Sequence, residues 1–363
     1  MKKIWIPIIV VVIIIGVVAI FYKPAPKGTI KIGAILPLSG FAANRGEEAK
    51  QGIDLAVEEF SKLENLDVKV IYEDSAADST KAVNAANKLI DIDRVKILIG
   101  PLSSSEAIAV SKIAQEKEVV MITPISGNPE VTKAGNFIFR TIMTTDQEGE
   151  GIAKLIKELN ISKIAIISLN NDYGNGIVDI LKNKSGLEIV AKEKYNLGDK
   201  DFRSQLTKIK ATNPRAVILI GYTEVGTILK QAKELGINSI FISGAAFEGQ
   251  DTLKNAEGTA EGVLYVYHGY KQDLTSKFYK KYQEKFGKVP SQYVTFSYDT
   301  TKLVLKAIKE VGNDSKKISQ YLTDVKDFAG EGRIINFDQE RNLLNPQIIF
   351  KTVKNGQFVP YEE

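Results

Sequence analysis

The feature that most constrains the fold is a regular alternation of short apolar runs with amphipathic segments from residue 29 onward. Runs rich in valine and isoleucine, such as VKILIG at 95–100 and AVILI at 216–220, show no alternation of apolar and polar residues. Between such runs, apolar residues recur every three or four positions, as in the segment 46–60. Continuous apolar strands separated by amphipathic helices indicate parallel strands that are covered by helices on both faces.

The alternation runs through two successive sets, and 363 residues are enough for two domains of about 150 residues each. We therefore predict an α/β fold of two doubly wound, Rossmann-like lobes with parallel sheets. Two helical segments follow the second set, which indicates that the chain returns to the first lobe. The predicted division assigns 29–144 and 270–330 to lobe 1, and 145–269 and 331–363 to lobe 2.

The N-terminus carries a membrane-targeting signal. Lys2 and Lys3 precede an apolar stretch from residue 4 to residue 22, which is about the roughly 20 residues that a membrane-spanning helix needs. The core of a cleaved signal peptide is shorter, roughly 7–15 residues. We interpret 1–28 as an uncleaved, single-pass N-terminal anchor with a spacer, which places the binding domain outside the cell membrane. The alternative is a signal that is cleaved to give a secreted or periplasmic protein.

The composition excludes several classes of function. The chain has no cysteine, and His268 is its only histidine, so thiolate metal sites and histidine-based catalytic triads have no ligands or base. The 48 basic residues barely exceed the 44 acidic ones, and no basic block is interleaved with aromatic residues. We therefore expect no nucleic-acid partner, no metal and no cofactor. His268 is assigned no role.

Polar residues gather where apolar runs end. In GPLSSSEA, residues 100–107, three serines follow a strand and precede a helix. Backbone N–H groups and the helix dipole favour an anion at such a place. One interpretation is that these serines bind a carboxylate. The other is that Ser104 or Ser105 caps the helix, with Glu106 in its first turn.

Tyr173, in SLNNDYGNG, and Tyr222, in GYTEVG, lie at equivalent strand ends of the second set. A tyrosine ring offers a wall to apolar ligand groups, and its hydroxyl offers one directed hydrogen bond. Packing within the loops is the alternative interpretation for both. Arg45, in the loop after the first strand, either meets an anionic ligand or is a solvated surface residue.

Taken in order, several segments resemble one family: IGAILPLSGFAANRGEEAKQGIDLAVEEF, YEDSAADSTKAVNAANKLI, ILIGPLSSSEA, MITPISGNPEVT, NDYGNG, GDKDFRSQLTKIK, GYTEVGTILKQAKELG and the terminal FAGEGRIINFDQERNLLNPQIIFKTVKNGQF. From about residue 29 to 363 the chain resembles the type I periplasmic solute-binding proteins, specifically the branched-chain amino-acid (Leu/Ile/Val) binding group. The resemblance implies two lobes joined by three crossovers that close on a ligand. It also implies an ABC permease as the membrane partner to which the ligand is delivered.

The resemblance also implies ligand-binding residues. The serine that bonds the ligand carboxylate corresponds to Ser104, and a backbone position that helps to hold the amino acid corresponds to Ile125. Two tyrosines of the second lobe correspond to Tyr173 and Tyr222, and an aromatic position in a late helix corresponds to Tyr293.

Three positions depart from the family's pattern. Gly127 stands where the family has a threonine, although the neighbouring Ser126 can supply a hydroxyl. Arg45 stands in place of a tyrosine. Ala245 stands in place of the acidic residue that pairs with the ligand ammonium, and an unpaired buried ammonium costs several kcal/mol.

Because Ala245 carries no carboxylate, two possibilities remain. Either Glu224 or Glu248 supplies the missing carboxylate, or the ligand lacks an ammonium and is a carboxylate or an amide, with Arg45 facing a second negative charge. The leading hypothesis is an extracytoplasmic solute-binding protein of an ABC import system that captures an amino acid or a related small carboxylate or amide. The alternative is a receptor domain that senses its ligand and signals through a partner. An enzyme is not expected, because no nucleophile–base pair or metal set is present in the sequence.

Overall fold

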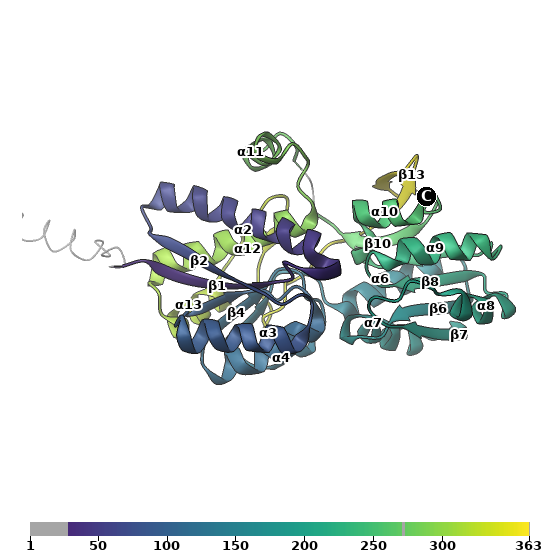
Figure 1. Cartoon of the computed structure of the whole chain (residues 1–363), viewed down its shortest axis with the longest axis horizontal. Helices are drawn as coiled ribbons and strands as arrows, with labels where there is room; N and C mark the ends of the chain where they lie inside the picture. The colour runs from purple at the N-terminus through teal and green to yellow at the C-terminus, as the bar shows by residue number, and fades with distance from the viewer. Residues whose placement is uncertain (1–27, 271–272, 363) are drawn as a thin grey trace, which may run out of the picture.

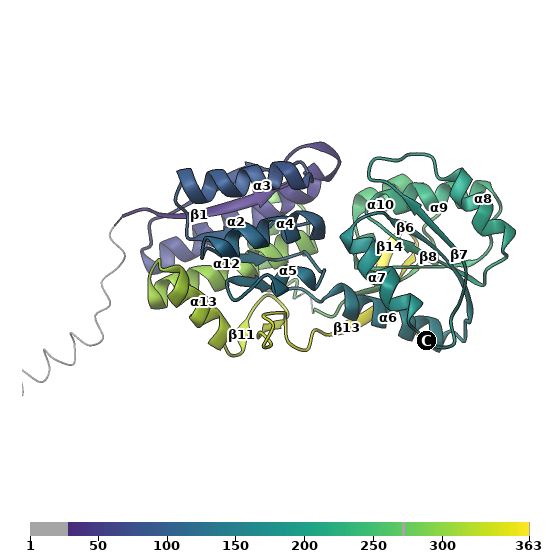
Figure 2. The ribbon, with the colours of Figure 1, turned by 90° about the horizontal axis from the view of Figure 1, so that it is seen from below.

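The computed structural model describes residues 28–270 and 273–362, and Figures 1 and 2 show two lobes side by side. The first sheet has five parallel strands in the order β2-β1-β3-β4-β5. This order changes direction between β1 and β3, which leaves a crevice at the carboxyl ends of those two strands. The strands are β1 (Ile30–Leu36), β2 (Val68–Asp74), β3 (Ile97–Ile99), β4 (Val120–Thr123) and β5 (Ile138–Arg140).

The second sheet repeats that topology. Its parallel part has the order β7-β6-β8-β9-β10, and β13 and β14 extend the β10 edge as antiparallel strands. The corresponding crevice therefore lies at the ends of β6 and β8. The strands are β6 (Lys163–Leu169), β7 (Glu188–Tyr195), β8 (Ala216–Ile220), β9 (Ile240–Ser243), β10 (Leu264–His268), β13 (Ile348–Lys354) and β14 (Gln357–Pro360). The two parallel sheets confirm the predicted two-lobed α/β fold.

Helices cover both sheets, as Figures 1 and 2 show. Those of lobe 1 are η1 (Gly40–Ala42), α2 (Ala43–Glu64), α3 (Ser79–Asn87) with its π-helical extension η2 (Lys88–Ile92), α4 (Ser104–Glu116), α5 (Glu130–Lys133), α11 (Lys277–Phe286), α12 (Gln292–Val311) and α13 (Ser315–Asp324). Those of lobe 2 are α6 (Thr145–Glu158), α7 (Asp172–Lys182), α8 (Arg203–Ala211), α9 (Glu224–Glu234), η3 (Ala245–Phe247) and α10 (Gln250–Ala256). Among the described residues, no helix is both long and apolar enough to cross a bilayer. The predicted anchor at 4–22 lies outside the described residues.

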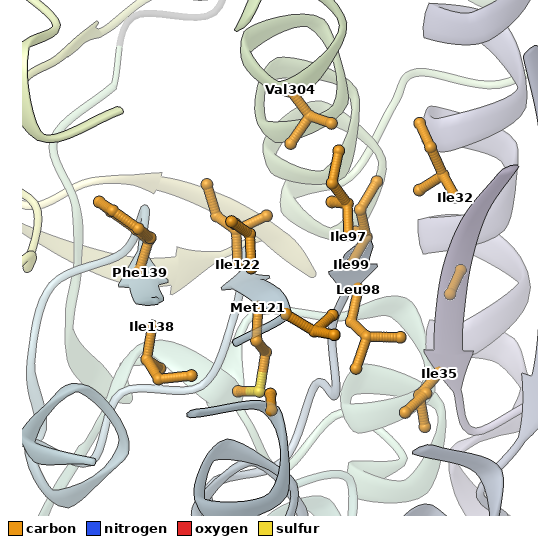
Figure 3. Close-up of a cluster of buried hydrophobic side chains, with 14 of the residues drawn as sticks. Ile32, Ile35, Ile97, Leu98, Ile99, Met121, Ile122, Ile138, Phe139 and Val304 are labelled. Carbon is orange, nitrogen blue, oxygen red and sulfur yellow. The ribbon is translucent and has the colours of Figure 1, made fainter. Parts of the chain in front are cut away.

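The core of lobe 1 shows why the short apolar runs form central strands. All three residues of β3 are fully buried, because helices cover both faces of the sheet. Figure 3 shows Ile97 and Ile99 of β3 with Ile122 of β4 and Val304 of α12 in one cluster. Helix α12 follows the second sheet in sequence but packs in the first lobe, mainly against α2.

Helices α2 and α12 pack backbone to backbone. A Cβ atom added to Gly52 of α2 would lie 2.2 Å from the carbonyl oxygen of Val294 in α12. Only glycine permits that approach, because any side chain at Gly52 would overlap the neighbouring helix backbone. The contact fixes the late helix against the first lobe, and the start of α12 then reaches the boundary between the lobes.

The segment at 328–343, around the predicted lobe boundary at residue 331, packs on the core of lobe 1. Two short strands, β11 (Phe328–Ala329) and β12 (Ile334–Ile335), form a small hairpin, and Phe337 and Leu343 also belong to the core of lobe 1. The chain joins the second lobe only at β13, whose Val353 packs in the other core. The short segments at 328–343 have no helical or strand periodicity, so their lobe could not be predicted from the pattern.

Candidate functional site

A small cavity lies between the lobes, at the carboxyl ends of the central strands of both sheets. Its volume is about 50 Å³, and the lobes contact each other directly around it. Lobe 1 lines it with Ser104, Ile125, Gly127, Gln292 and Tyr293 among others. Lobe 2 lines it with Glu148, Tyr173, Tyr222 and Ala245, and the crossover segments add Met143 and His268. This is where the topology of doubly wound sheets places a ligand.

The three serines after β3 have three different partners. Ser103 is the N-cap residue of α4, but its hydroxyl donates to the Glu106 carboxylate and makes no bond to the helix backbone. The Ser104 hydroxyl accepts the Asn128 N–H at 3.2 Å, and the Ser105 hydroxyl accepts the Asp172 N–H at 3.4 Å. Neither Ser104 nor Ser105 caps the helix, so that interpretation is wrong.

Ser104 lies at the first position of α4, is buried, and lines the cavity. The positive end of the α4 dipole and the first-turn N–H groups therefore meet the cavity beside its hydroxyl. Gly127, in the loop after β4, also lines the cavity and presents no side chain to it, while its carbonyl accepts the Thr145 N–H at 2.8 Å. Together these groups form a place suited to a carboxylate.

Ser126 lies behind the cavity wall. Its hydroxyl donates to the backbone carbonyls of Pro101 and Ser103, at 2.9 and 3.0 Å, and it is not among the residues that line the cavity. Ser126 therefore ties the loop after β4 to the loop after β3. The direction of this hydroxyl could not be predicted, because loop side chains follow no periodicity.

Tyr173 and Tyr222 form one wall of the cavity. Asn171 caps α7 by accepting the Gly174 N–H at 2.9 Å, which places Tyr173 in the first turn of that helix. The rings of Tyr173 and Tyr222 are stacked, with centroids 5.6 Å apart and planes 16° apart. Tyr293, at the start of α12, adds a third aromatic ring from the other lobe. The apolar part of a ligand would meet these faces.

Arg45 lies outside the cavity, behind two of its tyrosines. Its guanidinium carbon is 4.9 Å from the ring centroid of Tyr222 and 5.4 Å from that of Tyr293. Its Nη2 donates to the Ala246 carbonyl at 3.4 Å, across the boundary between the lobes. Arg45 lines two adjoining cavities and not the central one. It therefore joins the lobes in this arrangement and backs the aromatic wall.

The carboxylate that lines the cavity is Glu148, which was not among the predicted ligand-binding residues. Its Oε1 accepts the Tyr173 hydroxyl and the Ala245 N–H, each at 2.7 Å. Burial raises the pKa of Glu148 to about 7, an effect larger than the opposing effect of those two hydrogen bonds. A signal was present in the sequence: Glu148 shares the apolar face of α6 with Ile152 and Leu155.

The two carboxylates suggested by the sequence as substitutes for Ala245 lie elsewhere. Glu248 pairs with Lys351 and accepts the Tyr265 hydroxyl, and it lines the larger groove of about 710 Å³ that adjoins the site. Glu224 begins α9 and does not line the central cavity. Of the described residues that line the cavity, Glu148 alone carries a carboxylate.

His268 ends β10 where the chain crosses between lobes, and it lines both the central cavity and a second one along the crossovers. Burial lowers its pKa to about 3, so the imidazole is neutral near pH 7. No lysine or arginine lines the cavity among the described residues. Near pH 7 the site combines helix-end N–H groups on lobe 1 with the half-ionised carboxyl group of Glu148 on lobe 2.

Polar contacts across the boundary hold the lobes together in this arrangement. The Asn128 side chain donates to the Asp172 carbonyl at 2.8 Å, and the Asn44 side chain donates to Asp251 at 2.9 Å. These two contacts join the lobes directly on either side of the cavity.

Comparison with known proteins agrees with this geometry. A family model described as periplasmic binding protein matches residues 29–357, which is nearly all of the described chain. The chain belongs to the periplasmic binding protein family. This is a family of binding proteins, in agreement with the prediction that the chain is not an enzyme.

Several relatives of this periplasmic binding protein are named as amino-acid-binding proteins. It is 34% identical over 256 residues to the Leu/Ile/Val-binding protein BraC3 of Rhizobium johnstonii, covering 68% of each chain. It is 30% identical over 334 residues to the leucine-, isoleucine-, valine-, threonine- and alanine-binding protein of Pseudomonas aeruginosa, covering 87% of this chain and 88% of that one.

Solved structures show the same fold. The branched-chain amino-acid transporter substrate-binding protein LivJ of Streptococcus pneumoniae, in complex with isoleucine, superposes with a TM-score of 0.84 at 28% identity, covering 91% of this chain and 98% of that one. The leucine-binding protein LivK of Thermotoga maritima gives 0.83 at 27% identity, covering 92% and 98%.

Proposed function

We propose that this periplasmic binding protein captures an amino acid, or a closely related small carboxylate or amide, between its lobes and presents it to an ABC permease for import. The observation that carries the proposal is the single cavity that combines Ser104 and the α4 N-terminus with the stacked Tyr173 and Tyr222. One lobe thus offers donors for a carboxylate, and the other offers a wall for an apolar side chain. The amino-acid-binding relatives support the same ligand class.

We propose that five of the seven predicted residues bind the ligand: Ser104, Ile125, Tyr173, Tyr222 and Tyr293. All five line the cavity. Arg45 and Ser126 do not touch the ligand in this proposal. Arg45 supports the aromatic wall, and Ser126 holds the loop after β4 in place.

The binding domain belongs outside the cytoplasmic membrane, because an import receptor meets its solute there. We propose that the apolar stretch at 4–22 keeps it at the membrane as a single-pass anchor, with Lys2 and Lys3 on the inner side. A receptor held at the surface stays close to its permease.

A thermal-unfolding screen tests the function. The purified full chain is heated with neutral amino acids, acidic amino acids, amides and small carboxylates in turn. A ligand at 100 times its Kd stabilises the native state by about 2.7 kcal/mol, so we expect a branched-chain amino acid to raise Tm by roughly 5 °C or more. D-leucine, which carries the same charges with the opposite handedness, is the control. Unchanged unfolding with all four classes would contradict the proposed function.

A further inference from the structure

We propose that Glu148 binds the α-ammonium group of the ligand, so that the cleft selects amino acids over the same acids without an amino group. This inference rests on the proposed function and makes its ligand class narrower. Among the described residues that line the cavity, Glu148 is the carboxylate, and no lysine or arginine is present there to neutralise it. The group that would complete the site is therefore a cation on the ligand.

The two oxygens of Glu148 have different surroundings. Oε1 is held by the Tyr173 hydroxyl and by the Ala245 N–H. Oε2 makes no hydrogen bond with any described residue, while the side chain itself is buried, with 4% of its surface exposed. A buried carboxylate with one oxygen fixed and one oxygen without a partner is poised to accept an ammonium N–H.

Small residues opposite α6 make room for this carboxylate. A Cβ atom on Gly244 would lie 2.1 Å from Glu148 Oε1 and 2.9 Å from the Tyr173 hydroxyl. The neighbouring Ala245 has a short side chain, and its backbone N–H is the second donor to Oε1. The Gly244–Ala245 turn and Glu148 therefore form one unit, in which the backbone of the turn positions a carboxylate that comes from another helix.

The ionisable groups around Glu148 offer it no positive charge near pH 7. Tyr173 of α7, Tyr222 after β8 and Tyr293 of α12 are all buried, and burial raises the pKa of each hydroxyl. His268 of β10 is neutral because burial lowers its pKa to about 3. Arg45 is separated from the cavity by the rings of Tyr222 and Tyr293. A ligand ammonium would be the first cation within reach, and it would favour the ionised carboxylate.

Calorimetric titration of the purified full chain tests this inference. The probes are leucine, isoleucine, valine and alanine, each compared with the acid of the same carbon skeleton that lacks the amino group. The variants are Glu148→Gln, which keeps the shape and an oxygen acceptor, and Glu150→Gln, which removes a charge from the exposed face of the same helix. Thermal unfolding of each ligand-free variant checks that it is folded.

We expect the wild type to bind its best amino acid about 100-fold or more tightly than the deaminated acid, because the buried carboxylate would otherwise be left without a partner. The affinity of Glu148→Gln for the amino acid should be lower by roughly that factor, so that this variant binds both compounds alike. The affinity of Glu150→Gln for the amino acid should stay within about threefold of wild type. An independent measurement uses wild type alone: below pH 7 its affinity for the amino acid should fall about tenfold per pH unit, as Glu148 becomes protonated.

Three outcomes would overturn the inference. Glu148→Gln that binds the amino acid within about threefold of wild type would show that the ammonium has another partner. Wild type that binds a deaminated acid as tightly as its amino acid would show that the cleft does not select the amino group, while the solute-binding function would stand. Wild type that binds none of the eight compounds would contradict the proposed function, and the inference would fall with it.

Discussion

Replacing Arg140 by methionine is expected to lower the free energy of unfolding by about 3–5 kcal/mol, which is what removing one partner from a buried charged network costs. Arg140 ends β5 and is fully buried. Its guanidinium donates to Asn342 Oδ1, to Thr132 Oγ1 and to the carbonyls of Ser126 and Asn128. Burial lowers the pKa of Arg140 to about 10, so the group is still charged at pH 7.

Loss of the Arg140 hydrogen bonds would also disturb the binding site. The carbonyls of Ser126 and Asn128 point inward to Arg140, so the arginine fixes the loop that carries Gly127 into the cavity. Methionine fills much of the volume but leaves these acceptors without donors, and each unsatisfied buried group costs about 1–3 kcal/mol. Urea unfolding followed by circular dichroism measures the change.

The control is Arg203→Met. Arg203 is exposed and pairs with Asp201 and Glu234 on the surface, so its replacement is expected to change the free energy of unfolding by about 1 kcal/mol or less. If both variants lost the same free energy of unfolding, the buried hydrogen bonds of Arg140 would stabilise the fold no more than a surface ion pair does. That result would contradict the structural role of Arg140.

Ser104→Ala is expected to weaken binding of the amino acid that the thermal screen identifies by about 10- to 100-fold. A hydrogen bond to a charged group contributes about 1.5–3 kcal/mol, and the Ser104 hydroxyl is positioned to donate to the ligand carboxylate while it accepts the Asn128 N–H. The fold should survive, because alanine is a good helix former at the start of α4. Calorimetry gives the affinity, and the unfolding midpoint without ligand checks the fold.

Ser111→Ala is the matched control in the same helix. Ser111 is equally buried, but its hydroxyl bonds only to the carbonyl of Ile108 within α4. Its replacement should leave affinity unchanged. If Ser104→Ala also binds with wild-type affinity, the carboxylate does not lie at the α4 N-terminus.

Sequence patterns predicted the two lobes because buried parallel strands have a recognisable form. The runs at 97–99 and 216–220 are apolar without interruption, and they form the central strands β3 and β8. Topology then placed the strand-end residues together: Ser104 follows β3, while Tyr173 and Tyr222 follow β6 and β8. That these residues share one cavity could therefore be predicted from the strand order, without knowing any individual contact.

Side-chain direction could not be predicted in the same way. Ser126 and Arg45 were expected to face the ligand, but Ser126 bonds to loop carbonyls and Arg45 lies behind the tyrosines. Glu148 resembles an ordinary acidic residue of a helix's first turn, where the dipole favours it, so its position near the helix start did not point to the cavity. Its place on the apolar face of α6 was the clue, because a carboxylate there must be buried against something polar.

The measurement that tests the central claim most directly is small-angle scattering of the full chain with and without the amino acid found in the screen. Lobe 1 supplies Ser104 and lobe 2 supplies Glu148 and Tyr173, so a ligand that touches all three favours the closed arrangement held by the Asn128–Asp172 contact. We predict a smaller radius of gyration at saturating ligand than without it. Saturation confirmed by calorimetry, with no change in the scattering curve, would contradict capture by lobe closure.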